Sequence, residues 1–237
     1  MQNDKEGTVR EVAATMLGTE NLKKPAEDYV SELAGALKDD HLGVRIAAAT
    51  SLRNVGEGAK PAVPALIAVA SSGKEHALVR QAAVHVVTRY GKDNAATMPL
   101  LINLAKDADN PFALREIALD GLGRSGSDAA DVINVLTETL TDKNVELRKA
   151  GATALGSLGA KSKSGWGVIK DRLVYKIDEK ASRPLAVEAD SSVRNHLIRL
   201  SGVLGKATPD AVGVLVNAAK HDDSTENRIA PIQELGE

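Results

Sequence analysis

The sequence repeats one helical segment at nearly constant intervals, and this repetition constrains the fold more than any other feature. The segment VRIAAATSLRNVG begins at Val44, and similar segments begin at Val79, Leu114, Leu147 and Val193. Each carries arginine as its second residue, and weaker copies lie near both ends. The seven arginines, spaced by 35, 35, 35, 33, 46 and 34 residues, are Arg10, Arg45, Arg80, Arg115, Arg148, Arg194 and Arg228. A fixed period of roughly 20 to 50 residues is typical of repeat architectures.

Each repeat is predicted to contain two helices, because another segment of helical apolar periodicity precedes each arginine-bearing segment. The expected first helices span 25–38, 61–71, 95–106, 128–141, 165–181 and 209–221. Their starts fit Pro25, Pro61 and Pro209 at the first turn and Ser127 as an N-cap. We expect a flexible stretch at 1–8 and one solenoid over 9–237. It divides into a half-repeat at 9–21 and repeats at about 25–56, 61–91, 95–126, 128–159, 160–205 and 209–237.

Two further positions recur with the arginines. Eleven residues after the arginine stand Asn21, Gly56, Gly91, Gly126, Gly159 and Gly205, which predicts left-handed residues at the helix ends. Six residues before it stand Asp4, Asp39, Lys74, Asp109, Asp142, Glu188 and Asp222, with Glu75 directly after the exceptional Lys74. These acids can accept from N–H groups at the helix start or pair with the arginine of their own or a neighbouring repeat. We interpret them as a ladder that fixes the register, since seven similar pairs do not make seven active sites.

Two antiparallel helices per unit, an acidic turn, Val-Arg opening the second helix and a closing Leu-Gly together resemble HEAT repeats. The chain is most similar to the short bacterial HEAT-like repeats found also in phycobilisome lyases, from about Val9 to Gly236. This resemblance implies an all-α, right-handed α-solenoid of about six repeats, and proteins that serve mostly as scaffolds and binding surfaces. The last copy departs from the pattern with Asn227 in place of Val or Leu. It also has Pro231 inside the helix, where a kink or an end is expected.

Composition argues against several functional classes. Aromatic residues make up only 2% of the chain and the net charge is −2, which disfavours a nucleic-acid groove. Cysteine is absent, so disulfides and thiolate sites are excluded. No apolar run approaches the roughly 20 residues of a membrane span. The N-terminal MQNDKEGT is not a signal peptide, although a leader removed earlier would leave no trace, so the compartment stays undecided.

No catalytic, metal or cofactor motif stands out. His41, His76, His85, His196 and His221 lie in different repeats without metal-ligand spacing, and His196 falls at an offset expected to be buried. GEG at 56–58 and GRSG at 123–126 are helix ends and not phosphate loops. We therefore predict no catalytic residues, no metal and no cofactor.

The repeat from Arg148 to Arg194 is longer than the others, and the extra residues lie in 160–192. This region is predicted to hold a longer helix at about 168–181 and the loop SRPLAVEADSS. Trp166 and Tyr175 are candidate contact residues there, because insertions in repeat proteins often map to a binding face. The alternative is a longer helix with a solvated basic side, in which Trp166 packs on its neighbour.

The second helices are predicted to bury one face and expose the other. The buried positions are Ala47, Ala48, Leu52, Ala82, Ala83, Val87, Ile117, Ala118 and Leu122. The opposite face, which the resemblance implies is concave, carries candidate partner-binding residues. They are Arg53, Asn54, Gln81, His85, Arg89, Glu116, Asp120, Arg124, Lys149 and Arg199. The alternative is an ordinary solvated helix face.

The sequence leaves several functional hypotheses open. The leading one is a non-enzymatic scaffold or adaptor that binds a protein or peptide on this face. A lyase-type protein or lyase subunit that acts on a chromophore or cofactor is the alternative, by analogy at the level of the repeat alone. Nucleic-acid binding is disfavoured by charge and composition. The half-repeats at both ends also fit one module of a longer chain or complex.

Overall fold

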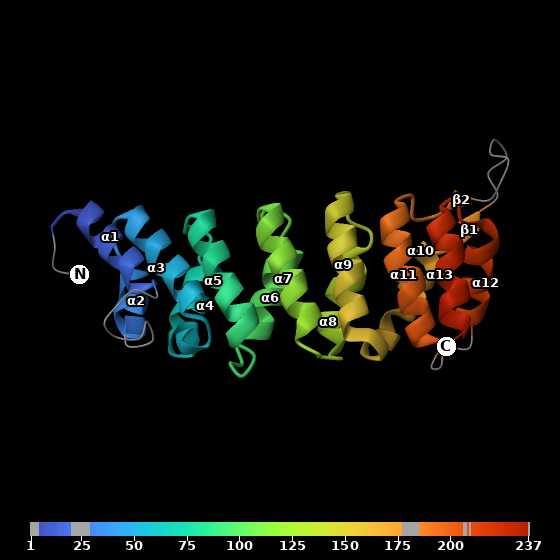
Figure 1. Ribbon diagram of the computed structural model, residues 1–237, viewed down its shortest axis with the longest axis horizontal. Helices are drawn as coiled ribbons and strands as arrows, with labels where there is room; N and C mark the ends of the chain where they lie inside the picture. Colours follow the sequence, from blue (N-terminus) through green and yellow to red (C-terminus); the bar gives the residue numbers. More distant parts are fainter. Residues whose placement is uncertain (1–4, 20–28, 177–184, 206–207, 209, 237) are drawn as a thin grey trace. The chain divides into compact units, whose positions relative to one another are not determined.

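The computed structural model is an all-α solenoid, as the repeats predict, and describes residues 5–19, 29–176, 185–205, 208 and 210–236. Pairs of antiparallel helices follow one another along the chain (Figure 1). The chain divides into two compact units, Met1–Gly121 and Leu122–Glu237. Within the described ranges, no helix is both long enough and apolar enough to cross a membrane.

In the first unit, the arginine-bearing second helices stack on one another. They are α1 (Gly7–Leu17), α3 (Leu42–Val55), α5 (Ala77–Tyr90) and α7 (Phe112–Arg124), the last of which ends in the second unit. The first helices are α2 (Val30–Ala36), α4 (Val63–Ser71) and α6 (Thr97–Lys106), and a 3-10 segment, η2 (Gly56–Ala62), precedes α4. Helix α3 packs on α1 and on α5, and α4 packs on α5 and on α6.

The second unit continues the alternation with one variation. Its second helices are α9 (Val145–Leu158), α11 (Ser191–Leu204) and α13 (Thr225–Gly236), and its first helices are α8 (Ala130–Thr139), α10 (Trp166–Arg172) and α12 (Ala211–His221). A 3-10 segment, η3 (Gly159–Gly165), precedes α10. Strands β1 (Tyr175–Lys176) and β2 (Leu185–Ala186) form an antiparallel pair after α10. Helix α11 packs on both α9 and α13.

Small side chains let the stacked helices approach closely. The predicted inward positions are buried, except Ile117, which is half-buried. A Cβ added to Gly18 would lie 2.3 Å from Ser51, one on Gly121 would lie 2.5 Å from Thr88, and one on Gly123 would lie 2.7 Å from Ala154. Alanine, valine and leucine therefore fill the core, which accounts for the scarcity of aromatic residues.

The closing glycines have two different roles. Gly56, Gly126 and Gly159 have φ of 74°, 65° and 55°, so the predicted positive φ is confirmed there. It is wrong for Gly91, with φ −93°, and for Gly205, with φ −55°. A Cβ on Gly91 would lie 2.6 Å from the Val87 carbonyl oxygen, so close approach, and not φ, requires glycine there. Asn21 lies outside the described residues.

Three predicted helix boundaries are wrong. The helix expected over 165–181 ends at Arg172, because the backbone carbonyl of Arg172 accepts from Glu188 N–H at 3.0 Å as the chain returns through β2. Helix α13 does not end at Pro231 but continues to Gly236, since packing on α11 and α12 offsets the lost hydrogen bond, and the kink that was the other expected outcome stays a prediction. Pro61 lies inside η2, and Pro64 occupies the first turn of α4 instead.

Other local predictions fall partly outside the described ranges. Residues 20–28, 177–184 and 209 are not described, so the expected positions of Pro25 and Pro209 and the middle of the insertion stay predictions. Gly7 and Thr8, expected in the flexible stretch, belong to α1. Helix α8 begins at Ala130, and Ser127 accepts from Ala129 N–H at 3.2 Å just before it.

Candidate functional site

The recurring arginine is the fourth residue of every second helix, and its guanidinium joins consecutive repeats. Arg10 donates to Asp39, Arg45 to Glu75, Arg148 to Glu188 and Arg194 to Asp222, at 2.8 to 3.1 Å. The carboxylate belongs in each case to the turn of the following repeat. We call this series the arginine ladder. It confirms that the acid pairs with the arginine of a neighbouring repeat.

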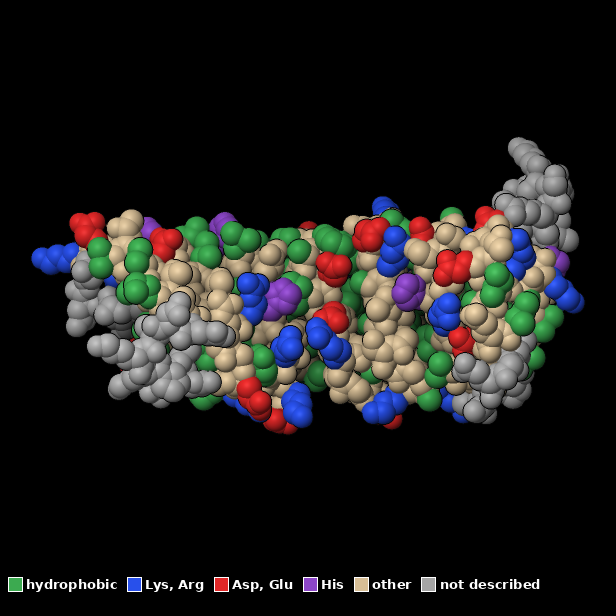
Figure 2. Space-filling model, in the orientation of Figure 1, with side chains coloured by type: hydrophobic (Ala, Val, Ile, Leu, Met, Phe, Trp, Pro, Cys, Tyr) green, Lys and Arg blue, Asp and Glu red, His purple; other side chains and the backbone are tan. Residues whose placement is uncertain are grey.

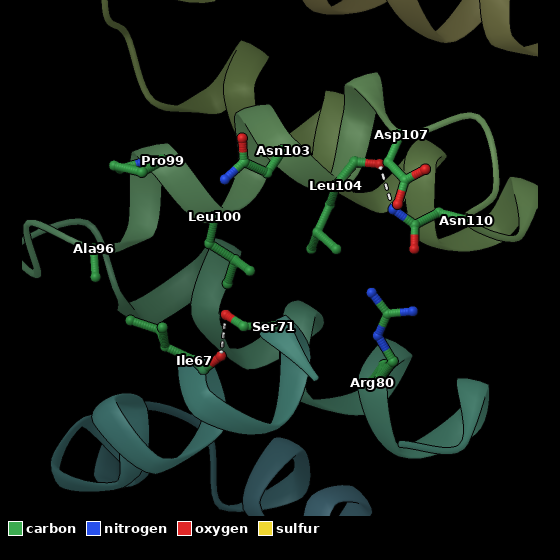
Figure 3. Close-up of a pocket in the computed structure, with 10 residues that line it drawn as sticks. All are labelled: Ile67, Ser71, Arg80, Ala96, Pro99, Leu100, Asn103, Leu104, Asp107 and Asn110. Atoms are coloured by element: carbon green, nitrogen blue, oxygen red, sulfur yellow. Dashed lines mark hydrogen bonds between the residues drawn. The ribbon is translucent and has the colours of Figure 1, made fainter. Parts of the chain in front are cut away.

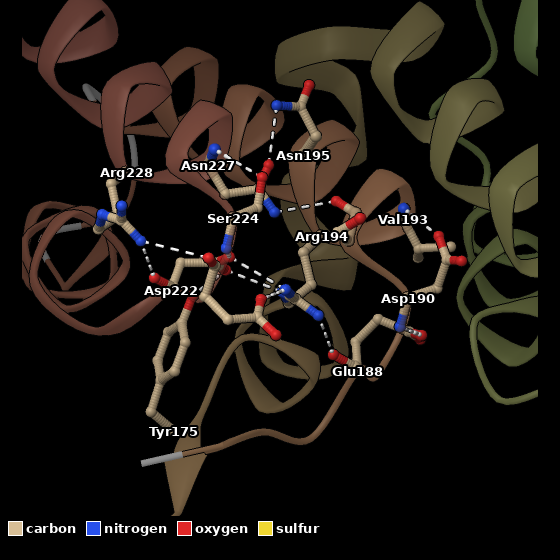
Figure 4. A network of polar contacts seen from close by, with 12 residues as sticks. Tyr175, Glu188, Asp190, Val193, Arg194, Asn195, Asp222, Ser224, Asn227 and Arg228 are labelled. Carbon is tan, nitrogen blue, oxygen red and sulfur yellow. Dashed lines mark hydrogen bonds and ion pairs between the residues drawn. The ribbon is translucent and has the colours of Figure 1, made fainter. Parts of the chain in front are cut away.

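The ladder is buried most deeply near the end of the chain (Figure 4). Arg194 is 3% exposed and donates to Asp222, to Asp223 and to the carbonyls of Glu188 and Ala189. Burial would raise the pKa of Asp222, but hydrogen bonds from Arg194 and Tyr175 outweigh it and hold that pKa below its usual value. The Asp222 carboxylate is therefore charged and structural.

The ladder has an open step at Arg80. Its Nε donates to the Ala70 carbonyl at 3.0 Å, and it makes no ion pair with any residue that the structure describes. Within the described residues, Asp109, the acid of the following turn, is exposed and makes no ion pair with Arg80, so the predicted ladder is interrupted here. In each of the other turns that the structure describes, the N–H of the residue just before the helix donates to the recurring acid, as His41 does to Asp39 at 2.9 Å. The equivalent residue here is Pro111, which has no N–H, so nothing holds Asp109 inward.

The predicted partner-binding residues lie on the exposed face of the second helices, opposite the buried positions, and we call them the second-helix row. In the first unit all are exposed except Gln81, which is half-buried. They are Arg53 and Asn54 on α3, Gln81, His85 and Arg89 on α5, and Glu116 and Asp120 on α7. Arg53 and Arg89 have no hydrogen-bond or ion-pair partner among the described residues. Figure 2 shows charges of both signs scattered over this face, without one continuous patch.

In the second unit the row also makes contacts within the chain, as His85 and Asp120 do in the first unit. Lys149 on α9 pairs with Glu146 at 3.0 Å. Arg199 on α11 donates to Asn195 at 3.1 Å and lies 3.7 Å from Glu234 of α13. Arg124, at the end of α7, is exposed but also has a partner within the chain. These side chains would have to exchange existing partners in order to bind another molecule.

Trp166 and Tyr175, the candidate contact residues of the insertion, both make hydrogen bonds inside the second unit. The Trp166 indole is 9% exposed and donates to Asp210 at 2.7 Å. Lys170 also donates to Asp210, at 2.8 Å. The Tyr175 hydroxyl donates to Asp222 at 2.6 Å, and burial followed by this hydrogen bond raises the pKa of Tyr175 above its usual value. Packing within the unit accounts for both side chains.

Sequence reasoning missed two parts of this arrangement and misplaced one residue. Nothing in the sequence pairs Trp166 with Asp210, which lies 44 residues away. The absent N–H of Pro111 was a readable signal for the open step at Arg80. His196 is exposed and not buried, and its Nδ1 lies 2.8 Å from the Ser192 carbonyl oxygen of the same helix. No group of three or more His, Cys, Asp or Glu suited to a metal occurs among the described residues.

Comparisons with known proteins agree with this architecture. The family model for HEAT repeats matches residues 1–88 and 98–164. The crystal structure of YibA from Escherichia coli is 25% identical, with a TM-score of 0.66, and the match covers 99% of this chain and 78% of YibA. No curated protein matches the sequence.

Two further structures resemble the fold alone. The CpcE–CpcF complex of phycocyanin lyase from Nostoc is 21% identical, with a TM-score of 0.54, over 92% of this chain and 79% of the lyase chain. A designed armadillo repeat protein is 12% identical, with a TM-score of 0.62, over 87% and 98% of the two chains. Since the family model covers more than half of its residues, the chain belongs to the HEAT-repeat family.

Proposed function

We propose that the chain is a non-enzymatic scaffold or adaptor that binds a protein or peptide segment on the second-helix row, at the row's residues in the first unit. The observation that carries this proposal is the state of Arg53 and Arg89. Both are exposed, both come from stacked helices, and neither has a partner among the described residues. Because the ladder holds α3 to its neighbours, these side chains are presented at a fixed spacing. Binding to a rigid surface loses less entropy than binding to a mobile one.

The charges of the row indicate the chemistry of the partner. Two free guanidiniums favour carboxylates of an acidic segment, since Arg and carboxylate pair bidentately. Glu116 on α7 adds negative charge in the same unit, so the partner is expected to carry a basic residue beyond its acidic ones, whereas Asp120 already has a partner within the chain. Binding of this kind weakens with salt, because exposed charges are screened.

Affinity capture with two matched baits tests the proposal. One bait carries Arg53→Glu and Arg89→Glu. The control carries Lys38→Glu and Lys92→Glu, which make the same change in charge at exposed positions outside the row. Both must keep the helical circular dichroism of the native chain. We expect a partner that the native bait and the control retain and that the row variant loses. A partner retained equally by all three baits would contradict the proposal.

A lyase-type subunit is the alternative function. The similarity to phycocyanin lyase concerns the fold alone, and it does not indicate a role for any described residue of the row. Incubation with a bilin and an acceptor protein tests it directly. A new visible absorption band from bilin covalently attached to the acceptor would favour the lyase function over the scaffold function.

A further inference from the structure

A pocket in the first unit opens between the first helices α4 and α6 (Figure 3). Its volume is about 300 Å³, at the lower end of the range typical of small-molecule sites. Ile67, Leu100 and Leu104 form an apolar wall, and Arg80 lies at one end. The pocket contains no residue of the second-helix row, so it is independent of the proposed function.

Arg80 is a buried cation whose binding capacity is only partly used. Arg80 is 9% exposed. Among the described residues it makes one hydrogen bond, from its Nε to the Ala70 carbonyl. The terminal guanidinium nitrogens point into the pocket (Figure 3). Burial lowers the pKa of Arg80, and the charge of Asp107 partly offsets this effect. Since no carboxylate among the described residues pairs with these nitrogens, this end of the pocket favours an anion.

The rest of the chain indicates which anion fits. Arg10, Arg45, Arg148 and Arg194 occupy the same helical position, and each is paired with a carboxylate of the following turn. Among the described residues, Arg80 has no such carboxylate and keeps the Ala70 carbonyl alone, whereas Arg228, the last arginine of the series, donates to the carbonyls of Asp222 and Asp223 and to Thr225. We propose that this pocket binds the carboxylate of an apolar ligand on Arg80, with the apolar part of the ligand against Ile67, Leu100 and Leu104.

A phosphate ligand fits the pocket less well. Asp107 also lines it, and its negative charge opposes a dianion more strongly than a monoanion. A single guanidinium supplies two parallel donors, which match one carboxylate. Asn110 is 9% exposed, and its side-chain nitrogen donates to the Leu104 carbonyl at 3.2 Å. The Asn110 side-chain amide lies opposite Arg80 at the same end of the pocket (Figure 3).

Nuclear magnetic resonance titration of the full chain tests the proposal with two kinds of probe. The first is 3-phenylpropanoate, a free apolar acid. The second is an acetylated tripeptide that ends in leucine with a free carboxyl group. Saturable shifts of the Arg80 Nε–H and Asn110 side-chain signals are expected with at least one probe. A response to the acid alone would identify a small-molecule site, and a response to the peptide alone would identify a site for peptide carboxyl ends. Absence of a response to both would overturn the proposal.

Three variants make the test specific. Arg80→Gln is expected to weaken binding at least tenfold, whereas Lys74→Gln, which removes a neighbouring exposed charge, leaves it unchanged. Asp107→Asn keeps an oxygen for its bond from Asp109 N–H and removes the opposing charge, so binding should strengthen severalfold. If Arg80→Gln does not fold, the affinity of Asp107→Asn for the probes tests the proposal instead. Equal binding by Arg80→Gln, or weaker binding by Asp107→Asn, would contradict a carboxylate on Arg80. The amides of both probes should not bind.

Discussion

Arg80 and Arg194 have the same place in their helices and are both deeply buried, yet they are satisfied in opposite ways. Arg194 holds two carboxylates, those of Asp222 and Asp223, besides two backbone carbonyls. Arg80 holds one carbonyl, that of Ala70. The comparison teaches that the arginine alone does not define a step of the ladder. The step closes only when the following turn points its carboxylate inward.

The largest expected effect separates two acids that stand six residues before an arginine. Asp222→Asn leaves Arg194 buried without its main counter-ion, and the apparent free energy of unfolding should fall by about 3–5 kcal/mol. Asp109→Asn, at the equivalent position but exposed, should change it by less than about 0.5 kcal/mol. Urea denaturation followed by circular dichroism measures both. Equal losses would mean that the ladder does not depend on where the carboxylate points.

Acid should weaken the closed steps. The pKa values of Glu188 and Asp222 are held below their ordinary values of 4.5 and 3.8, because hydrogen bonds from arginine outweigh the opposing effect of burial. Glu188 and Asp222 therefore stabilise the fold fully at pH values above their ordinary pKa values. This stabilisation is lost as the pH falls below those values and through the lower pKa values of the folded chain. Each pKa unit corresponds to about 1.4 kcal/mol.

Thermal unfolding between pH 7 and pH 3 measures this dependence. The melting temperature should fall with acid below about pH 4.5. The fall should be shallower in Asp222→Asn, which has one such group fewer, and unchanged in Asp109→Asn. A melting temperature that is constant down to pH 3 would show that the ladder carboxylates do not stabilise the fold.

Much of the fold could be predicted from the sequence, because the signals repeat. The seven arginines, the glycines that follow most of them and the apolar spacing mark the second helices and, with them, six helix pairs, so the errors lie where a repeat is unique. The helix expected over 165–181 fails because strand pairing and the Glu188 contact depend on residues far along the chain. The open step at Arg80 depends on Pro111, whose effect appears only when the neighbouring turns are compared. The partner-binding residues of the row remain a prediction.

Pro111→Ser should close the open step. Serine restores the N–H that the other turns use to hold their acid, so Asp109 should turn inward and pair with Arg80. The charge-assisted pair stabilises the folded chain, and the loss of proline gives the unfolded chain more conformational freedom. The difference predicts a gain of about 1 kcal/mol in the free energy of unfolding. The double variant with Asp109→Asn should lose this gain. A gain that survives in the double variant would assign it to the backbone alone.

The smallest expected effect on stability is that of the second-helix row. Arg53→Glu with Arg89→Glu alters two exposed side chains without partners, so the free energy of unfolding should change by less than about 0.5 kcal/mol in total. Arg199→Glu is the informative contrast, because it places a carboxylate beside Glu234 and should lower the melting temperature more than either first-unit change. Differential scanning calorimetry of the three single variants ranks these effects. A larger loss at Arg53 or Arg89 would mean that these arginines stabilise the fold, and the first unit would then be the weaker candidate for the binding surface.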